Sequence, residues 1–164
     1  MGIKLNFRSI HLTYDMASMV DITGKPEVYR EARAEGFIKL RSSTIKAIEE
    51  GKVPKGDVLT VARIAAINAV KMTPRLIMLS HPIPITGVDV DIEPSSSSIK
   101  VSVTVKSESK TGVELEALIG VAAALINIFD MVKPLEKDEH GVYPETLIYG
   151  IRVVSKVKGG ESKL

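Results

Sequence analysis

Two strictly alternating segments joined by a short serine turn constrain the fold of this chain most strongly. GVDVDIE (87–93) and IKVSVTVKS (99–107) each place an aliphatic residue at every second position, and PSSSS separates them. This alternation is typical of strands that bury one face, and the short connection predicts an antiparallel hairpin. The acidic residues of the first strand oppose Lys100 and Lys106 on the second. Cross-strand pairing therefore explains these acids better than a metal cluster does.

The segments around the hairpin predict helices and two further strands. Residues 30–40 fit a helix or a strand, and their last residues favour a strand. Helical patterns follow at 42–51, where a serine is the expected N-cap, and after Asp57, with a third at 111–133. The final segment predicts a strand whose alternation puts four residues on one face, namely Arg152, Val154, Lys156 and Lys158. This order predicts an α+β ferredoxin-like sandwich, an antiparallel sheet with helices packed on one face.

Composition excludes several classes of function. The 164 residues contain no cysteine, which rules out disulfides, thiolate metal sites and cysteine nucleophiles. The net charge of +2 argues against a general nucleic-acid footprint. No apolar run approaches about 20 residues and the N-terminus lacks a signal-peptide core, so we expect a cytoplasmic protein without a membrane span. We expect a flexible arm (1–18), one domain (19–158) and a tail (159–164).

Several candidate site residues each have a simple structural explanation. Thr111 and Glu114 have the spacing of a capping box at a helix start. That box leaves Glu116 unexplained, although a first-turn carboxylate also favours the helix dipole. His81 lies in a proline-rich loop beside a core segment, where it either contacts a ligand or bonds to a backbone carbonyl. Lys55 precedes the expected helix start at Asp57, a place that favours anions.

The end of the long apolar helix carries the most suggestive pair. In FDMVKP (129–134), Asp130 and Lys133 are three residues apart and can touch on a helix. A surface ion pair is the simple explanation. The alternative is an acid/base pair in which burial lowers the pKa of Lys133 toward about 7–8, so that it exchanges protons at neutral pH.

Five motifs occur in order along the chain and together resemble one family. They are MVDITGK (19–25), KGDVLTVARIAAINAVKMT (55–73), LIMLSHPIPIT (76–86), KTGVELEAL (110–118) and FDMVK (129–133). They resemble the cyclic pyranopterin monophosphate synthase family, also called the molybdenum cofactor biosynthesis protein C family. The resemblance runs from about residue 19 to residue 158, nearly the whole chain.

The resemblance implies a fold, a reaction and an assembly. It implies a ferredoxin-like lyase that converts a cyclised dihydro-GTP intermediate into cyclic pyranopterin monophosphate and releases pyrophosphate. It implies a small-molecule substrate and a homohexamer, a trimer of dimers with active sites at subunit interfaces. No redox cofactor and no bound metal are implied, and the role of magnesium with the substrate triphosphate stays open.

The motifs also imply site residues. The catalytic set comprises Asp130, Lys133 and Lys55. The substrate-binding set comprises Leu79, Ser80, His81, Leu115, Glu116, Glu114, Arg30, Lys71 and Lys156. Ser80 stands where cysteine is frequent in the family, Leu115 where methionine is, and Pro134 where alanine is common, so the helix is expected to end sooner. An extra residue near the C-terminus leaves Lys156 or Lys158 as the equivalent basic position.

Two other functions are compatible with some of these residues. A magnesium-dependent phosphohydrolase would use four residues around the ion, namely Glu114, Glu116, Asp130 and His81. A ferredoxin-like binding module for RNA or a regulatory ligand is the second. RNA-binding proteins with a ferredoxin-like fold stack bases on aromatic side chains of the sheet. The strand at 99–107 has no aromatic residue. The resemblance implies proton transfers and phosphate chemistry, and paired lysines can serve both. Neither alternative function accounts for the paired lysines as well.

Overall fold

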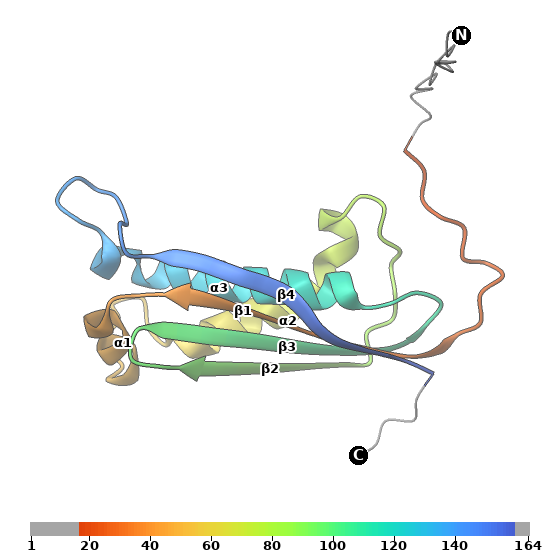
Figure 1. Cartoon of the computed structure of the whole chain (residues 1–164), viewed down its shortest axis with the longest axis horizontal. Coiled ribbons are helices and arrows are strands. Elements are labelled where there is room, and N and C mark those ends of the chain that lie inside the picture. The colour runs from red at the N-terminus through yellow and green to blue at the C-terminus, as the bar shows by residue number, and fades with distance from the viewer. Residues whose placement is uncertain (1–16, 160–164) are drawn as a thin grey trace, which may run out of the picture.

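The computed structural model describes residues 17–159 (Figure 1). The elements in chain order are β1 (Val28–Lys39), α1 (Ser42–Glu49), α2 (Val58–Leu76), β2 (Gly87–Pro94), β3 (Ser98–Ser109), α3 (Glu114–Glu136) and β4 (Leu147–Lys158). The strands form one antiparallel sheet in the order β2-β3-β1-β4, with α2 and α3 on one face. The predicted ferredoxin-like α+β sandwich is confirmed. The predicted arm and tail lie almost entirely outside the described residues.

The predicted hairpin is present as β2 and β3. The two strands pair antiparallel from Gly87 opposite Lys106 to Pro94 opposite Ile99. The serine turn between them is closed by the amide of Ser95, which donates to the carbonyl of Ser98 at 2.8 Å. The valines and isoleucine of β3 that face the helices are fully buried, which explains the strict alternation of this segment.

The segment that fitted either helix or strand is a strand from Arg30 to Lys39. β1 lies between β3 and β4, and its residues alternate between buried and half-buried positions. Ala32, Ala34 and Ile38 face the helices and are buried. The Arg, Glu and Ala residues of this segment favour a helix in isolation, but pairing on both sides decides the outcome because strand formation depends strongly on tertiary neighbours.

The predicted shared face of β4 is wrong because the strand contains irregularities. Arg33 pairs with Ser155 and the next residue of β1, Ala34, pairs with Val153, so Val154 has no partner on β1. One extra residue in a strand reverses the alternation of the side chains beyond it. As a result Arg152 lies opposite Glu35 on the open face of the sheet, whereas Lys156 lies opposite buried Ala32.

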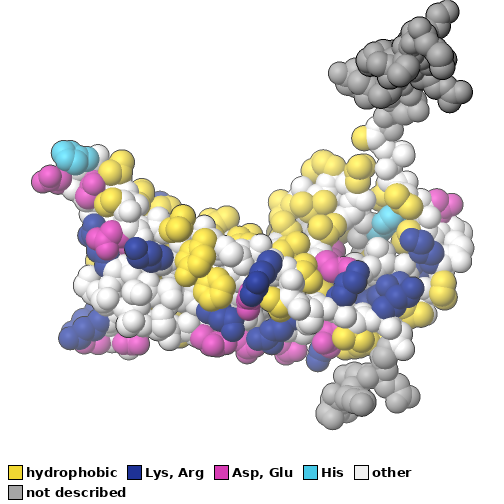
Figure 2. All heavy atoms as spheres, viewed as in Figure 1, with side chains coloured by type: hydrophobic (Ala, Val, Ile, Leu, Met, Phe, Trp, Pro, Cys, Tyr) yellow, Lys and Arg dark blue, Asp and Glu magenta, His cyan; other side chains and the backbone are white. Residues whose placement is uncertain are grey.

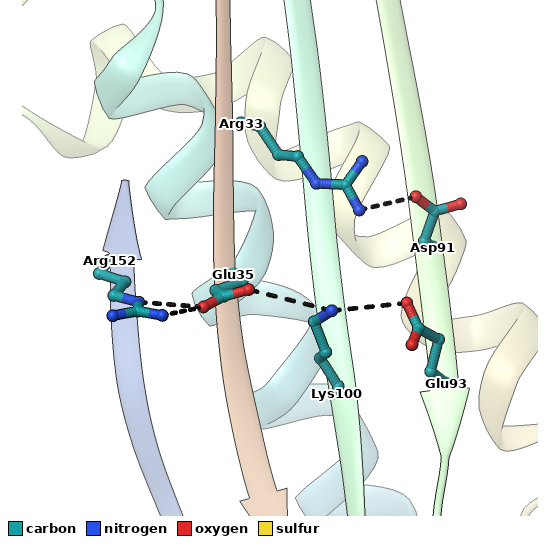
Figure 3. Close-up of polar contacts among 6 residues, drawn as sticks. All are labelled: Arg33, Glu35, Asp91, Glu93, Lys100 and Arg152. Carbon is teal, nitrogen blue, oxygen red and sulfur yellow. Dashed lines mark hydrogen bonds and ion pairs between the residues drawn. The ribbon is translucent and has the colours of Figure 1, made fainter. Parts of the chain in front are cut away.

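The open face of the sheet carries a network of ion pairs (Figure 3). Arg152 donates to Glu35 at 2.6 Å, and the other oxygen of Glu35 lies 3.9 Å from Lys100. Lys100 also lies 3.6 Å from Glu93, while Arg33 pairs with Asp91. Lys106 lies 3.6 Å from Asp89. The predicted cross-strand pairing of the β2 acids is therefore confirmed.

The helix α3 is the central core element. Its buried residues include Val121, Leu125 and Ile128, which pack against the sheet and α2. By length and composition alone α3 could cross a membrane, but half of its most apolar window is buried inside the protein, as for a core helix. Glycines allow its close approach: a Cβ on Gly36 would lie 2.8 Å from Val121, and one on Gly120 would lie 2.9 Å from Val70.

Candidate active site

Two lysines and an aspartate meet near the C-terminal end of α3. The ammonium nitrogen of Lys55 lies 2.6 Å from Oδ2 of Asp130, and that of Lys133 lies 2.8 Å from Oδ1. Lys55 also donates to the backbone carbonyl of Asp130 at 2.9 Å. Each carboxylate oxygen thus holds one lysine. The side chains are about half exposed, so a ligand can reach all of them.

Local structure places Lys55 at this position. It lies in the turn before α2, next to Gly56, whose φ of 101° is available to glycine without strain. Asp57 caps α2 as predicted, since its side chain accepts from the amide of Thr60 at 3.0 Å. The cap fixes the start of α2 two residues after Lys55, and Lys55 reaches across to Asp130 on α3.

The charges of this cluster settle its resting state. Hydrogen bonds from Lys133 and Lys55 lower the pKa of Asp130 to about 2. The same contact with Asp130 raises the pKa of Lys133 above its usual value. The predicted lowering of the Lys133 pKa is thus wrong for the single chain, because Lys133 is half exposed and its partner outweighs desolvation. The cluster rests as two ammonium groups around one carboxylate.

Two residues that the sequence did not single out support this end of α3. Glu136 is fully buried, and its oxygens accept from the amide of Arg41 at 3.0 Å and from the hydroxyl of Thr146 at 2.7 Å. It therefore links the last turn of α3 to the start of α1 and to the loop before β4. In that loop Tyr143 packs edge-on against Phe129, with ring centroids 5.0 Å apart.

An acid at the end of an apolar helix was the only sequence signal for Glu136, and it could not indicate burial. Helix α3 also continues through Pro134 to Glu136, so the predicted earlier end of the helix is wrong. The first residue after the helix, Lys137, donates its amide to the carbonyl of Lys133 at 3.1 Å. The carbonyl of Lys133 therefore keeps its helical hydrogen bond.

The other end of α3 borders a cavity of about 350 Å³. It is lined by five of the predicted substrate-binding residues, namely Leu79, Ser80, His81, Leu115 and Glu116. The loop 77–86 supplies the first three, and the hydroxyl of Ser80 donates to the carbonyl of Ile77 at 2.9 Å. Two segments of the chain far apart in sequence thus bring these residues to one hollow.

Glu116 is the most unusual group in this cavity. The residue is only 2% exposed, and burial raises the pKa of its carboxyl, helped by the nearby charge of Glu114. Lys71 and Glu116 both line a second, small cavity of about 90 Å³ on the side of Pro82. A carboxyl with a raised pKa inside a cleft is a candidate for binding or proton transfer.

A third group of charged residues lies beside the start of α3. The predicted capping box is wrong: α3 starts at Glu114 after Val113, without a side-chain cap. Glu114 instead accepts from Lys156 at 3.0 Å. Burial alone would raise the pKa of Glu114, but the contact with Lys156, a backbone hydrogen bond and the charge of Arg30 together lower the pKa. Glu114 and Lys156 line a small recess of about 60 Å³. Arg30 lines this recess as well and donates to the carbonyl of Lys110.

Lys156 rather than Lys158 carries the ion pair with Glu114, although both lysines line that recess. Both lysines lie beyond the bulge on the same face of β4, with Lys156 opposite Ala32 and Lys158 opposite Arg30, so position along the strand distinguishes them. Of the two basic positions that the sequence left open, Lys156 is therefore the one built into the helix start.

The two ends of α3 cannot form one site within a single chain. Glu116 and Asp130 are 14 residues apart on the same helix, which a rise of about 1.5 Å per residue converts to about 21 Å. The residues of the phosphohydrolase alternative are split by this distance. In the part of the chain that the structure describes, no three acidic or histidine side chains gather as a metal site.

Comparison with known proteins identifies the family. A sequence model of the MoaC family matches residues 19–159. The chain belongs to the MoaC family. Among its relatives named "Probable cyclic pyranopterin monophosphate synthase", that of Aeropyrum pernix is 57% identical over 143 residues, 87% of this chain and 98% of the relative. That of Archaeoglobus fulgidus is 57% identical over 151 residues, 92% and 97% of the two chains.

This MoaC-family chain also matches a relative of the same name from Pyrococcus abyssi, with 53% identity over 92% of this chain and 95% of the relative. The family match includes all five motifs found in the sequence. The resemblance inferred from those motifs is confirmed. The roles of individual residues stay predictions, and they converge on the two ends of α3 in this MoaC-family fold.

Proposed function

We propose that the chain is a cyclic pyranopterin monophosphate synthase in molybdenum cofactor biosynthesis. The reaction converts a cyclised dihydro-GTP intermediate into cyclic pyranopterin monophosphate and releases pyrophosphate. The family match and the names of the relatives support this reaction class. The structural observation that carries it is the joining of Lys55 and Lys133 on the two oxygens of Asp130. The regulatory-module alternative gives no reason for that arrangement.

The cluster suits the chemistry of this substrate. Ring rearrangement needs several proton transfers, and closure of a cyclic phosphate must expel pyrophosphate from a highly anionic molecule. Two ammonium groups neutralise phosphate charge and can donate protons to developing anions. Lys133 starts the cycle protonated, because Asp130 raises its pKa. It therefore acts first as a general acid, and as a base only after it has given up its proton.

Asp130 takes the orienting role in this proposal. A carboxylate with a pKa of about 2 remains ionised at neutral pH and is a poor proton store. With one lysine on each oxygen, it holds both ammonium groups at a fixed separation. His81 and Glu116, in the cavity at the other end of α3, would fix the pterin ring, while Arg30, Lys71 and Lys156 would hold phosphate oxygens.

We infer that a complete active site needs two copies of the chain. The two groups of predicted residues lie about 21 Å apart on α3, so a second copy must bring its cavity to the lysine cluster. The hexamer that the family resemblance implies offers such interfaces. Exposed hydrophobic side chains support association, and Figure 2 shows them gathered along a hollowed edge of the molecule. The groove of about 690 Å³ between α2 and α3 is lined by several, including Ile64, Met72 and Leu76.

Complementation between variants tests this shared site. Lys133→Ala chains and Glu116→Gln chains, each inactive alone, should regain activity when co-expressed with two different affinity tags and purified as mixed assemblies. Recovery is expected because some interfaces then pair two intact halves. Mixed assemblies that form but stay inactive would contradict the two-copy site, as would a protein that light scattering finds monomeric at assay concentration.

The reaction itself is tested with enzymatically generated cyclised dihydro-GTP. Wild type should form cyclic pyranopterin monophosphate, detected as its oxidised fluorescent product, and release pyrophosphate. Lys133→Ala and Asp130→Ala should form none, with circular dichroism confirming that each variant folds. A silent but correctly assembled wild type would overturn the proposed reaction, whereas active variants would return the cluster to a surface ion pair.

The proposal requires no resident cofactor, and magnesium enters only with the substrate triphosphate. A chelator should therefore change the apparent affinity for substrate without abolishing turnover at saturation. Complete loss at saturating substrate would favour the metal-dependent alternative. We place the reaction in the cytoplasm, as expected from the sequence.

A further inference from the structure

The backbone near the end of α3 contains a gap in its hydrogen-bond ladder. In a helix the carbonyl of residue 130 accepts from the amide of residue 134. Here residue 134 is a proline inside the helix, and proline has no N–H to donate. The neighbouring ladder bond from the amide of Lys137 to the carbonyl of Lys133 is intact at 3.1 Å. The carbonyl of Asp130 is therefore left without its helical donor.

Lys55 occupies this gap. Its ammonium nitrogen lies 2.9 Å from the carbonyl oxygen of Asp130 and 2.6 Å from Oδ2 of the same residue. Two acceptors on one residue fix the position of the nitrogen much better than one does. A surface lysine with a single carboxylate partner normally loses most of the benefit to side-chain entropy. The third N–H of the ammonium group remains for a substrate oxygen.

Packing does not account for Pro134. Its ring is exposed, so it does not fill the core. Its cost within a helix interior is large, about 3 kcal/mol relative to alanine, although α3 continues to Glu136 in spite of it. Pro134 lies four residues after Asp130, at the position that would normally donate to the carbonyl that Lys55 uses. Because the residue is costly and its ring is exposed, we expect it to act through that carbonyl.

We propose that Pro134 is a positioning residue for Lys55. By withholding an N–H it leaves the Asp130 carbonyl to the lysine, which is then held by two acceptors with one N–H directed to substrate. This proposal rests on the proposed function only for its effect on turnover, since the placement of Lys55 can be measured without substrate. An alanine at position 134 would return the N–H, which would compete with Lys55 for the carbonyl.

The test compares Pro134→Ala and Pro134→Leu with wild type. Both variants restore the N–H and both favour a helix, so folding should not suffer. Pro74→Ala is the matched control: Pro74 also lies inside a helix, α2, but the carbonyl it frees belongs to Val70 and not to the cluster. NMR of the lysine ammonium groups on ¹⁵N-lysine-labelled full-length protein reports the hydrogen bonding of Lys55, assigned with Lys55→Arg.

Both Pro134 variants should shift the Lys55 ammonium signal and speed its exchange with water, while the control leaves it unchanged. The kcat of both should fall about three- to tenfold, the size expected for one ordinary hydrogen bond, with little change in KM. An unchanged Lys55 signal overturns the proposal, even if kcat falls. A changed signal in only one variant also overturns it, because ring or side-chain shape would then be the cause. If wild type forms no product, the proposed function fails, and the Lys55 signal still decides the role of Pro134.

Discussion

Lys55 and Asp130 are 75 residues apart in the sequence, yet the lysine donates to both the side chain and the backbone carbonyl of the aspartate. This double contact joins the turn before α2 to the last part of α3. It makes one unit out of two motifs that the sequence shows only as separate stretches. The consequences can be tested by titration and by unfolding as well as by activity.

The low pKa of Asp130 predicts that this side chain stays ionised in mildly acidic solution. Its folded pKa of about 2 lies below the ordinary aspartate value of 3.8. The favourable contacts of the carboxylate are therefore complete above pH 3.8 and are lost only as the pH falls through about 2. Carbon-13 NMR of the aspartate carboxyl groups should show no Asp130 titration between pH 4 and 9. A midpoint near 4 would mean that the lysine contacts do not persist in solution.

The raised pKa of Lys133 predicts an ammonium group that persists at alkaline pH. Asp130 is the main cause, so Asp130→Asn should lower the Lys133 pKa toward its usual value. NMR titration of the lysine side-chain carbons measures this directly, with Lys133→Arg assigning the signal. A Lys133 midpoint that is the same in the wild type and in Asp130→Asn would contradict the structure.

Burial of Glu116 predicts a stability that falls with rising pH. Its folded pKa is raised by desolvation, so its contribution is fully present below pH 4.5 and is lost as the pH rises through the folded value. Glu116→Gln removes this ionisation. The variant should gain stability relative to wild type between pH 5 and 8 in urea unfolding, and the gain should disappear near pH 4. A constant difference across this range would show that Glu116 does not titrate abnormally.

The buried carboxylate of Glu136 predicts a clear difference between two substitutions. Glu136→Ala leaves the amide of Arg41 and the hydroxyl of Thr146 without their partner, which should lower the free energy of unfolding by about 1–3 kcal/mol. Glu136→Gln keeps an acceptor for Arg41 and should cost less. Urea unfolding measures both. Equal losses would show that the charge itself, and not hydrogen bonding, is what this position requires.

Close packing of α3 predicts intolerance of a single added methyl group. Gly36→Ala and Gly120→Ala each bring a Cβ within 3 Å of core side chains, and overpacking of this kind typically lowers the free energy of unfolding by about 1–3 kcal/mol. Gly24→Ala is the control, because a Cβ there meets nothing within 4 Å. In thermal unfolding, the Gly24→Ala control should have a clearly higher midpoint temperature than both core variants. Equal midpoints would mean that α3 can shift without loss.

Local sequence patterns were sufficient for several features. Period-two alternation located β2 and β3 and paired their acids with Lys100 and Lys106. The apolar stripe located α3, and Asp57 was correctly identified as the cap of α2. Five motifs were sufficient for the family. Each of these depends on neighbours within a few positions along the chain, or on a long ordered match of residues.

The tertiary structure decided what depends on residues distant in sequence. An unpaired Val154 placed Lys156 on the opposite face from Arg152, where it pairs with Glu114. Contact with Asp130, rather than burial, set the direction of the Lys133 pKa. The length of α3 separated the predicted site into two halves. Strand register, desolvation and charge all depend on which segments meet in space, and periodicity along the chain carries no information about that.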